Sequence, residues 1–93
     1  MKIGLLVLDF HLEACFSLKE KRHRLSCIRD KIGKQAIVAV CESGHHDSLE
    51  SSQWAFLAIS TSGKIVDKTL SEIEEYIDMN IDAQIVNSKR YNL

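Results

Sequence analysis

Five cations in the first third of the chain have the side chains and the close spacing that binding to an anionic partner requires. They are Lys19, Lys21, Arg22, Arg24 and Arg29. Lysine meets phosphate as a point charge, whereas arginine can bind phosphate or carboxylate through two parallel hydrogen bonds. These five residues are therefore the predicted nucleic-acid-binding residues. The alternative is an ordinary solvated helix face with local ion pairs.

The charge of the chain is unevenly distributed. Residues 1–34 carry eight Lys and Arg against four Asp and Glu, whereas residues 35–93 carry four against nine, and the net charge is −1. This asymmetry predicts one basic and one acidic face. The calculated pI of about 6.4 lies well below that of a dedicated nucleic-acid-binding domain. No aromatic residues interleave with the basic run, so any RNA contact should be to the backbone and should weaken as salt rises.

The segment from Glu42 to Asp47 is the only one that gathers metal-ligand residue types, in His45, His46 and Asp47. Adjacent histidines on an extended loop point in opposite directions, so no metal site is predicted. The plainer expectation is a polar hairpin loop in which Glu42 or Asp47 pairs with an arginine of the first helix.

No motif for a catalytic nucleophile, a phosphate-binding loop or a dinucleotide fingerprint is present. We therefore expect no catalytic residue and no cofactor, and a protein that is not an enzyme. A small metal-dependent enzyme at His45, His46 and Asp47 is the most distant alternative.

The cysteines and the hydropathy predict a cytoplasmic protein. Cys15, Cys27 and Cys41 are widely spaced and include no Cys-x-x-Cys pair, which favours reduced thiols. No apolar run approaches the roughly 20 residues of a membrane span, and the N-terminus has no small-residue cleavage site. Neither a secretory signal nor a membrane contact is expected.

The elements that must position the cations follow from hydrophobic periodicity. Strands are predicted over 3–12, 36–41, 53–60 and 82–91, and helices over 17–33 and 64–79. Ser17 and Glu20 form a capping box, in which Ser17 accepts the Glu20 amide and Glu20 reaches back to the Ser17 amide. The stripes expected to be buried are Leu18, Leu25, Ile28 and Ile32 on the first helix, and Val66, Leu70, Ile73 and Ile77 on the second.

The order strand, helix, strand, strand, helix, strand predicts one domain over residues 1–93 with an α+β, ferredoxin-like βαββαβ fold. This fold is a two-layer sandwich, with a four-stranded antiparallel sheet and both helices on one face. Strands 3–12 and 53–60 are the longest apolar runs and should lie in the centre. The polar segment 82–91 suits an edge.

The helices of such a sandwich leave one face of the sheet open. Ile3, Leu5 and Val7 alternate with Leu6, Leu8 and Phe10 on the first strand, while Ala55, Leu57 and Ile59 alternate with Trp54, Phe56 and Ala58 on the third. Both faces are therefore apolar, and an open face of this kind should not contact water. We expect a homodimer through the open sheet face, or a partner in its place.

The chain resembles the YlxP family of small bacterial proteins of unknown function. The resemblance is carried by Gly4–Leu12 and by Ser17-Leu18-Lys19-Glu20-Lys21-Arg22, which matches a Ser-Leu-Lys-x-Lys-Arg signature. Val40-Cys41-Glu42 resembles the family's Val-Ala-Glu, although Ser48-Leu49-Glu50 replaces its usual Leu-Trp-Gln.

The resemblance implies a ferredoxin-like fold and supplies no catalytic residue. Family members are often encoded beside translation and ribosome-maturation genes, which implies ribosomal RNA or a ribosomal particle as a partner. The leading hypothesis is thus a non-enzymatic RNA- or ribosome-associated binding protein that acts through its basic first helix. The alternative is a homodimeric adaptor whose basic helix meets an acidic protein surface.

Overall fold

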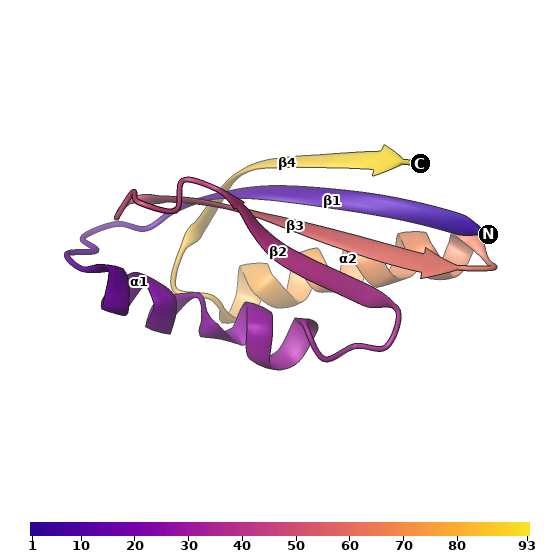
Figure 1. The fold of residues 1–93 in the computed structure, drawn as a ribbon, viewed down its shortest axis with the longest axis horizontal. Helices are drawn as coiled ribbons and strands as arrows, with labels where there is room; N and C mark the ends of the chain where they lie inside the picture. Colours follow the sequence, from indigo (N-terminus) through magenta and orange to yellow (C-terminus); the bar gives the residue numbers. More distant parts are fainter.

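Strands and helices follow one another along the chain in the predicted order. The computed structural model describes residues 1–93. Strands β1 (Lys2–His11), β2 (Val38–Gly44), β3 (Ser51–Ser60) and β4 (Gln84–Asn92) form one antiparallel sheet in the order β2-β3-β1-β4. Figure 1 shows the helical segments, α1 (Leu18–Arg24), the π-helix η1 (Ile28–Ile32) and α2 (Gly63–Asn80), beside this sheet. The ferredoxin-like α+β sandwich is confirmed, with β1 and β3 central and β2 and β4 at the edges.

The alternation of side chains along the central strands builds the core. Its strand residues are Leu6, Leu8, Phe10, Trp54, Phe56 and Ala58, all buried on the side of the helices. Helix α2 packs on β1 and β3 through its predicted stripe of Val66, Leu70, Ile73 and Ile77. The packing is close at Gly4, where an added Cβ would lie 2.6 Å from Val66 Cγ1. The absence of a side chain at Gly4 therefore lets α2 approach the sheet.

The first helical region is not the continuous helix predicted over 17–33. Helix α1 ends at Arg24, and the chain turns at Leu25 before the π-helix η1, which packs against β2. Leu25, Ile28 and Ile32 are buried as predicted, but Leu18 is 40% exposed, so its place in the buried stripe was wrong. The stem of Lys21, one turn later, takes the buried position on that face.

The N-terminus of α1 carries the predicted cap with one change. Ser17 Oγ accepts a hydrogen bond from the Glu20 amide at 3.1 Å. Glu20 Oε2 accepts from the amide of Phe16 at 2.7 Å, rather than from the predicted amide of Ser17. The cap therefore fixes one residue more of the incoming chain than a capping box would.

Several strand boundaries also differ from those predicted: β3 begins at Ser51 rather than at residue 53, and β4 begins at Gln84 rather than at residue 82. Strand β2 begins at Val38 and continues to Gly44, beyond the predicted end at Cys41, and its pairing with β3 shifts register between Glu42 and Gly44. The connection from β2 to β3 is therefore residues 45–50.

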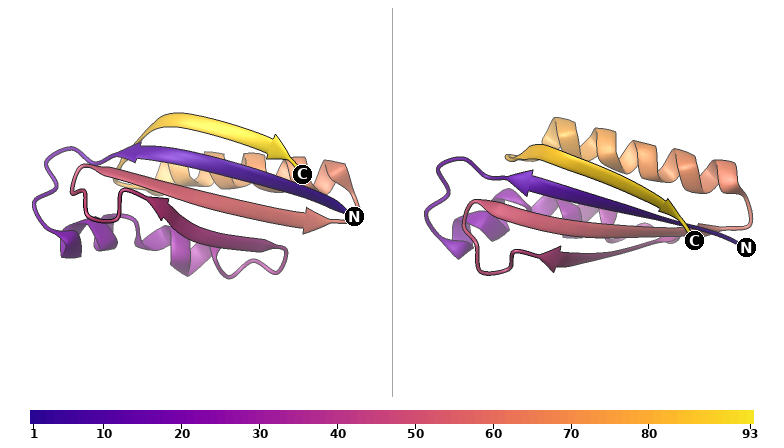
Figure 2. Two further views of the ribbon diagram at one scale, coloured as in Figure 1. Left: turned by 45° about the horizontal axis from the view of Figure 1, so that its top comes forward. Right: turned by 90° about the horizontal axis from the view of Figure 1, so that it is seen from above.

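The two termini lie at the same end of the sheet, as Figure 2 shows, and Leu93 N–H donates to the carbonyl of Ile3. None of the helices has the length and hydrophobicity that crossing a bilayer requires.

Candidate functional site

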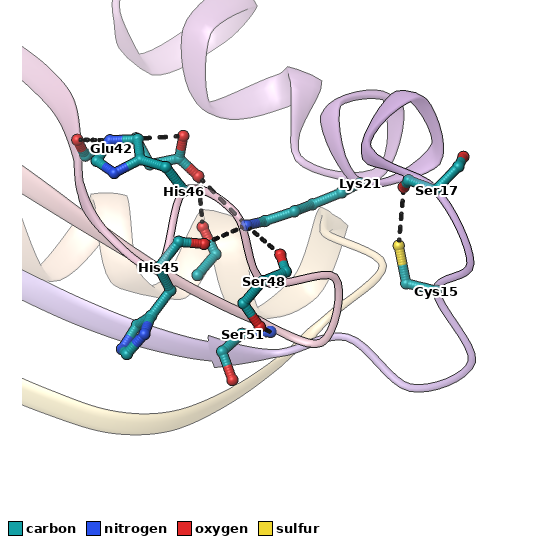
Figure 3. Close-up of polar contacts among 9 residues, drawn as sticks. Cys15, Ser17, Lys21, Glu42, His45, His46, Ser48 and Ser51 are labelled. Carbon is teal, nitrogen blue, oxygen red and sulfur yellow. Dashed lines mark hydrogen bonds and ion pairs between the residues drawn. The ribbon is translucent and has the colours of Figure 1, made fainter.

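Lys21 joins α1 to the turn that follows β2. Its side chain is 3% exposed, and Nζ donates to the carbonyl oxygens of His45 and Ser48, both at 2.7 Å (Figure 3). Glu42 Oε2 lies 3.7 Å from the same nitrogen. A buried ammonium is stable only when carbonyl and carboxylate oxygens replace its water. Lys21 is thus engaged within the protein and offers no free cationic group to a ligand.

Glu42 is the acidic centre of this contact. Its Oε2 accepts a hydrogen bond from the hydroxyl of Ser52, which is fully buried, at 3.0 Å. His46 Nε2 lies 3.9 Å from Glu42 Oε1 and forms a 3.0 Å contact with the Glu42 carbonyl oxygen. The predicted pairing of Glu42 or Asp47 with an arginine of the first helix is wrong, because the partner is Lys21. Figure 3 shows these side chains converging on the space between α1 and β2.

Arg24 is also held by the protein itself. Its Nε donates to the carbonyl oxygen of Asp82 at 2.8 Å and lies 3.2 Å from Asp82 Oδ2, while Nη1 donates to the carbonyl oxygen of Glu13 at 2.9 Å. The side chain is 12% exposed. Arg24 therefore ties α1 to two distant connections and is not free for a partner.

The other three predicted residues, Lys19, Arg22 and Arg29, are exposed. None of them takes part in a side-chain hydrogen bond or an ion pair within the protein. Lys31 and Lys34, which were not in the predicted set, are exposed and unpaired in the same way. Residues 18–34 thus include five exposed cations that form no hydrogen bond or ion pair within the protein. We call these five residues the cationic face.

A groove of about 570 Å³ lies between the helical region and the end of β2. Arg22 and Arg29 stand on its helical wall, and the opposite wall is formed by Glu42, His46, Asp47 and Trp54. Lys21 also lines the groove, and its hydrogen bonds to His45 and Ser48 attach α1 to the loop that follows β2. Three cations, Lys21, Arg22 and Arg29, and three carboxylates, Asp30, Glu42 and Asp47, share the lining. The charge of the lining is therefore mixed, and two of its cations, Arg22 and Arg29, also belong to the cationic face.

Trp54 was not singled out as a site residue from the sequence. It is 4% exposed, and its indole Nε1 is a buried donor with no hydrogen-bond partner. The guanidinium carbon of Arg29 lies 5.4 Å from the centre of its ring, within the range of a cation–π contact. The alternation of β3 already placed Trp54 on the helical side, but only the contact with Arg29 shows that it lies at the groove.

The histidines of the loop do not form a metal site. Figure 3 shows the rings of His45 and His46 pointing away from each other. His45 has a left-handed φ of 60°, and its carbonyl oxygen accepts from both Lys21 Nζ and the Ser48 amide. No group of three or more His, Cys, Asp and Glu side chains is arranged to hold a metal ion.

The thiols differ in their surroundings. Cys15 is buried and its Sγ donates to the carbonyl oxygen of Ser17, whereas Cys41 is exposed on β2. Burial raises the pKa of the Cys27 thiol above its ordinary value, and the nearby carboxylate of Asp30 raises it further. Cys27 therefore stays protonated at neutral pH, which is the opposite of an activated nucleophile.

The second face of the sheet carries no helix. Its apolar residues are half-buried or exposed, and they include Ile3, Leu5, Val7, Ala55, Leu57 and Ile59. A shallow hollow of about 180 Å³ on this face is lined by Leu5, Ala39, Val40, Cys41, Ala55 and Leu57, all hydrophobic. Asp9, Gln53 and Asn87 lie at one end of the face, where the side-chain amides of Gln53 and Asn87 both donate to the carboxylate of Asp9.

Comparison with known proteins places the whole chain in a family. No curated protein matches it. The model of a family described as "Protein of unknown function (DUF503)" matches residues 3–90, which include the entire sheet core, the cationic face and both walls of the groove. The chain is therefore a member of the DUF503 family of proteins of unknown function.

Proposed function

We propose that this protein is a non-enzymatic RNA-binding protein that contacts the phosphate backbone of ribosomal RNA through the cationic face. The observation that carries the proposal is the set of exposed cations Lys19, Arg22 and Arg29 on one helical region, none of which forms an internal hydrogen bond or ion pair. Lys31 and Lys34 extend this set toward the end of η1. Lys21 and Arg24 are left out, because their donors are satisfied inside the protein.

The placement of the acidic residues supports an anionic partner for this region. Helix α2 carries five carboxylates, at Asp67, Glu72, Glu74, Glu75 and Asp78, against two lysines. A polyanion approaching the molecule is attracted to one side and repelled from the other, so the charge distribution orients the encounter. The resemblance to the YlxP family, carried by Ser17 to Arg22, supports ribosomal RNA as the polyanion.

The test is binding of a labelled single-stranded ribosomal RNA fragment at several salt concentrations, together with co-sedimentation with ribosomal subunits. Each phosphate contact contributes about −0.7 to the slope of log K against log salt. The double variant Arg22→Glu/Arg29→Glu should weaken binding at least about hundredfold and make the slope less steep. Lys64→Glu/Lys68→Glu is the matched control, since it changes the net charge equally on α2 and should alter affinity by less than about threefold.

Three outcomes would count against the proposal. The first is absence of RNA binding, and the second is an equal loss in the control pair, which would indicate only a general charge effect. The third is recovery of a protein partner that survives ribonuclease treatment and depends on Arg22 and Arg29. This third result would favour the adaptor hypothesis, in which the cationic face meets an acidic protein.

We further propose that two copies pair through the open sheet face. The four strands are 10, 7, 10 and 9 residues long. At about 4.8 Å between strands and about 3.3 Å per residue, they give roughly 570 Å² per copy, or about 1,100 Å² for the pair. This area meets the lower limit of a specific interface. The apolar centre around Leu5 and Leu57, with Asp9, Gln53 and Asn87 at the rim, has the composition of one.

Sedimentation of the purified protein tests the pairing. The wild type should sediment as a dimer, and Leu57→Asp should sediment as a monomer because a carboxylate would be buried without a partner. Ile65→Asp is the control, since Ile65 is 48% exposed on α2 and its variant should remain dimeric. A wild-type monomer at concentrations well above the micromolar range would refute the pairing.

A further inference from the structure

We infer that the groove between the helical region and β2 binds one unpaired base of the RNA, while the cationic face holds the flanking phosphates. The inference rests on the proposed function and adds to it the class of nucleic acid: a single strand or loop rather than a duplex. Three features of the groove support the inference: the charge of its lining, the contact between Arg29 and Trp54, and the unpartnered indole donor.

The first feature is the charge of the lining. Three cations and three carboxylates share the lining: Asp30 lies beside Arg29 on the helical wall, and Glu42 and Asp47 lie on the opposite wall. Lys21 and Glu42 already interact with each other. A phosphate inside would lie close to Asp30 and Asp47 and would be repelled by both. A neutral planar group that both donates and accepts hydrogen bonds suits such a lining, and a nucleobase is a group of that kind.

The second feature is the pair formed by Arg29 and Trp54. Arg29 lies over the indole ring with its guanidinium N–H groups unpaired, and its side chain is exposed. A guanidinium plane supported by an aromatic ring is a surface on which bases stack, independently of their identity. The pair also lines a second hollow of about 440 Å³, so Arg29 and Trp54 stand between two recesses.

The third feature is the unpartnered donor at Trp54 Nε1. Buried donors in folded proteins almost always have an acceptor, and one without an acceptor calls for an explanation. The side chain of Arg29 is exposed and forms no hydrogen bond, so it is free to move when a base enters the groove. Trp54 Nε1 would then donate to a carbonyl oxygen or a ring nitrogen of that base, and the ligand would supply the acceptor that the protein lacks.

The single tryptophan of the chain makes this inference measurable. A mixed-sequence single-stranded RNA and a blunt duplex of equal length are titrated while Trp54 fluorescence is followed. We expect the single strand to quench Trp54 and to bind about tenfold more tightly than the duplex at the same salt concentration. Arg29→Lys keeps the charge but removes the plane, so it should abolish that preference while leaving the salt slope unchanged.

Arg90→Lys is the control, because Arg90 lies on β4, outside both the groove lining and the cationic face, and this variant should keep the preference for the single strand. Equal binding of duplex and single strand with unchanged Trp54 fluorescence would overturn the inference. If the two RNAs bound equally and Arg22→Glu/Arg29→Glu still abolished binding, the proposed function would stand without the inference about the groove. If the wild type bound no RNA, both the proposed function and the inference would be overturned.

Discussion

Helices α1 and α2 are held against the rest of this protein by different forces. Helix α2 is regular over its 18 residues and places four aliphatic side chains in the core. The α1–η1 region is interrupted at Leu25, and its first part buries only Lys21. The ammonium of Lys21 and the guanidinium of Arg24 attach that part to loops rather than to the core. Apolar packing therefore fixes α2, while directional polar contacts fix α1.

The difference explains why the candidate site lies on one helical region and not on the other. Polar contacts hold a helix at a defined distance from its neighbour, and here that distance leaves a groove. Close apolar packing removes such space, as the approach of α2 to Gly4 shows. The α1–η1 region thus presents the exposed cations, and the groove beside it borders Trp54 of β3.

The largest expected difference in stability is between the loss of a leucine from α2 and the loss of a leucine from α1. Leu70 in α2 is fully buried, so Leu70→Ala should lower the free energy of unfolding by about 3 kcal/mol. Leu18 in α1 is 40% exposed, so Leu18→Ala should lower it by less than about 1 kcal/mol. Urea denaturation followed by circular dichroism measures both, and similar losses would contradict the assignment of Leu18 to the surface.

The next effect concerns the polar attachment of α1. Lys21→Met should cost about 2 kcal/mol of stability, because it removes the ammonium that pairs with Glu42 and donates to two carbonyl oxygens. The double variant Lys21→Met/Glu42→Gln should be less destabilised than the sum of the two single variants, since the unpaired carboxylate is removed. Lys19→Met, an exposed and unpaired control, should change stability by less than about 0.5 kcal/mol. Strict additivity in denaturant unfolding would show that Lys21 and Glu42 do not interact.

The smallest effect compares two glycines, one in each region. An added Cβ at Gly33 would lie 2.8 Å from the carbonyl oxygen of Arg29, so Gly33→Ala should destabilise the protein by about 1 kcal/mol. At Gly63, the first residue of α2, the nearest atom would be Lys2 Cγ at 3.8 Å, and Gly63→Ala should stabilise by about 0.5 kcal/mol. Thermal unfolding of both variants should give shifts of opposite sign, and shifts of the same sign would contradict this reading of the π-helix terminus.

Much of the fold could be predicted because it depends on periodicity, which is a local property. The alternation along β1 and β3 identified the buried side of the sheet, and the spacing of Val66, Leu70, Ile73 and Ile77 identified the buried side of α2. The π-helix η1 could not be predicted from periodicity, because its residues fit an α-helix equally well. Leu18 was misplaced for the same reason, since it fits the spacing of the stripe while Lys21 occupies the buried position.

The amino-acid sequence by itself determined the order of elements, the side of each strand that enters the core and the concentration of cations near the N-terminus. Only the tertiary structure decided which of those cations are free. Lys21 and Arg22 are neighbours in the chain with the same charge, yet one donates to carbonyl oxygens 24 and 27 residues away and the other faces the groove. The physical reason is that burial and pairing of a charge depend on partners that the chain supplies only after it has folded.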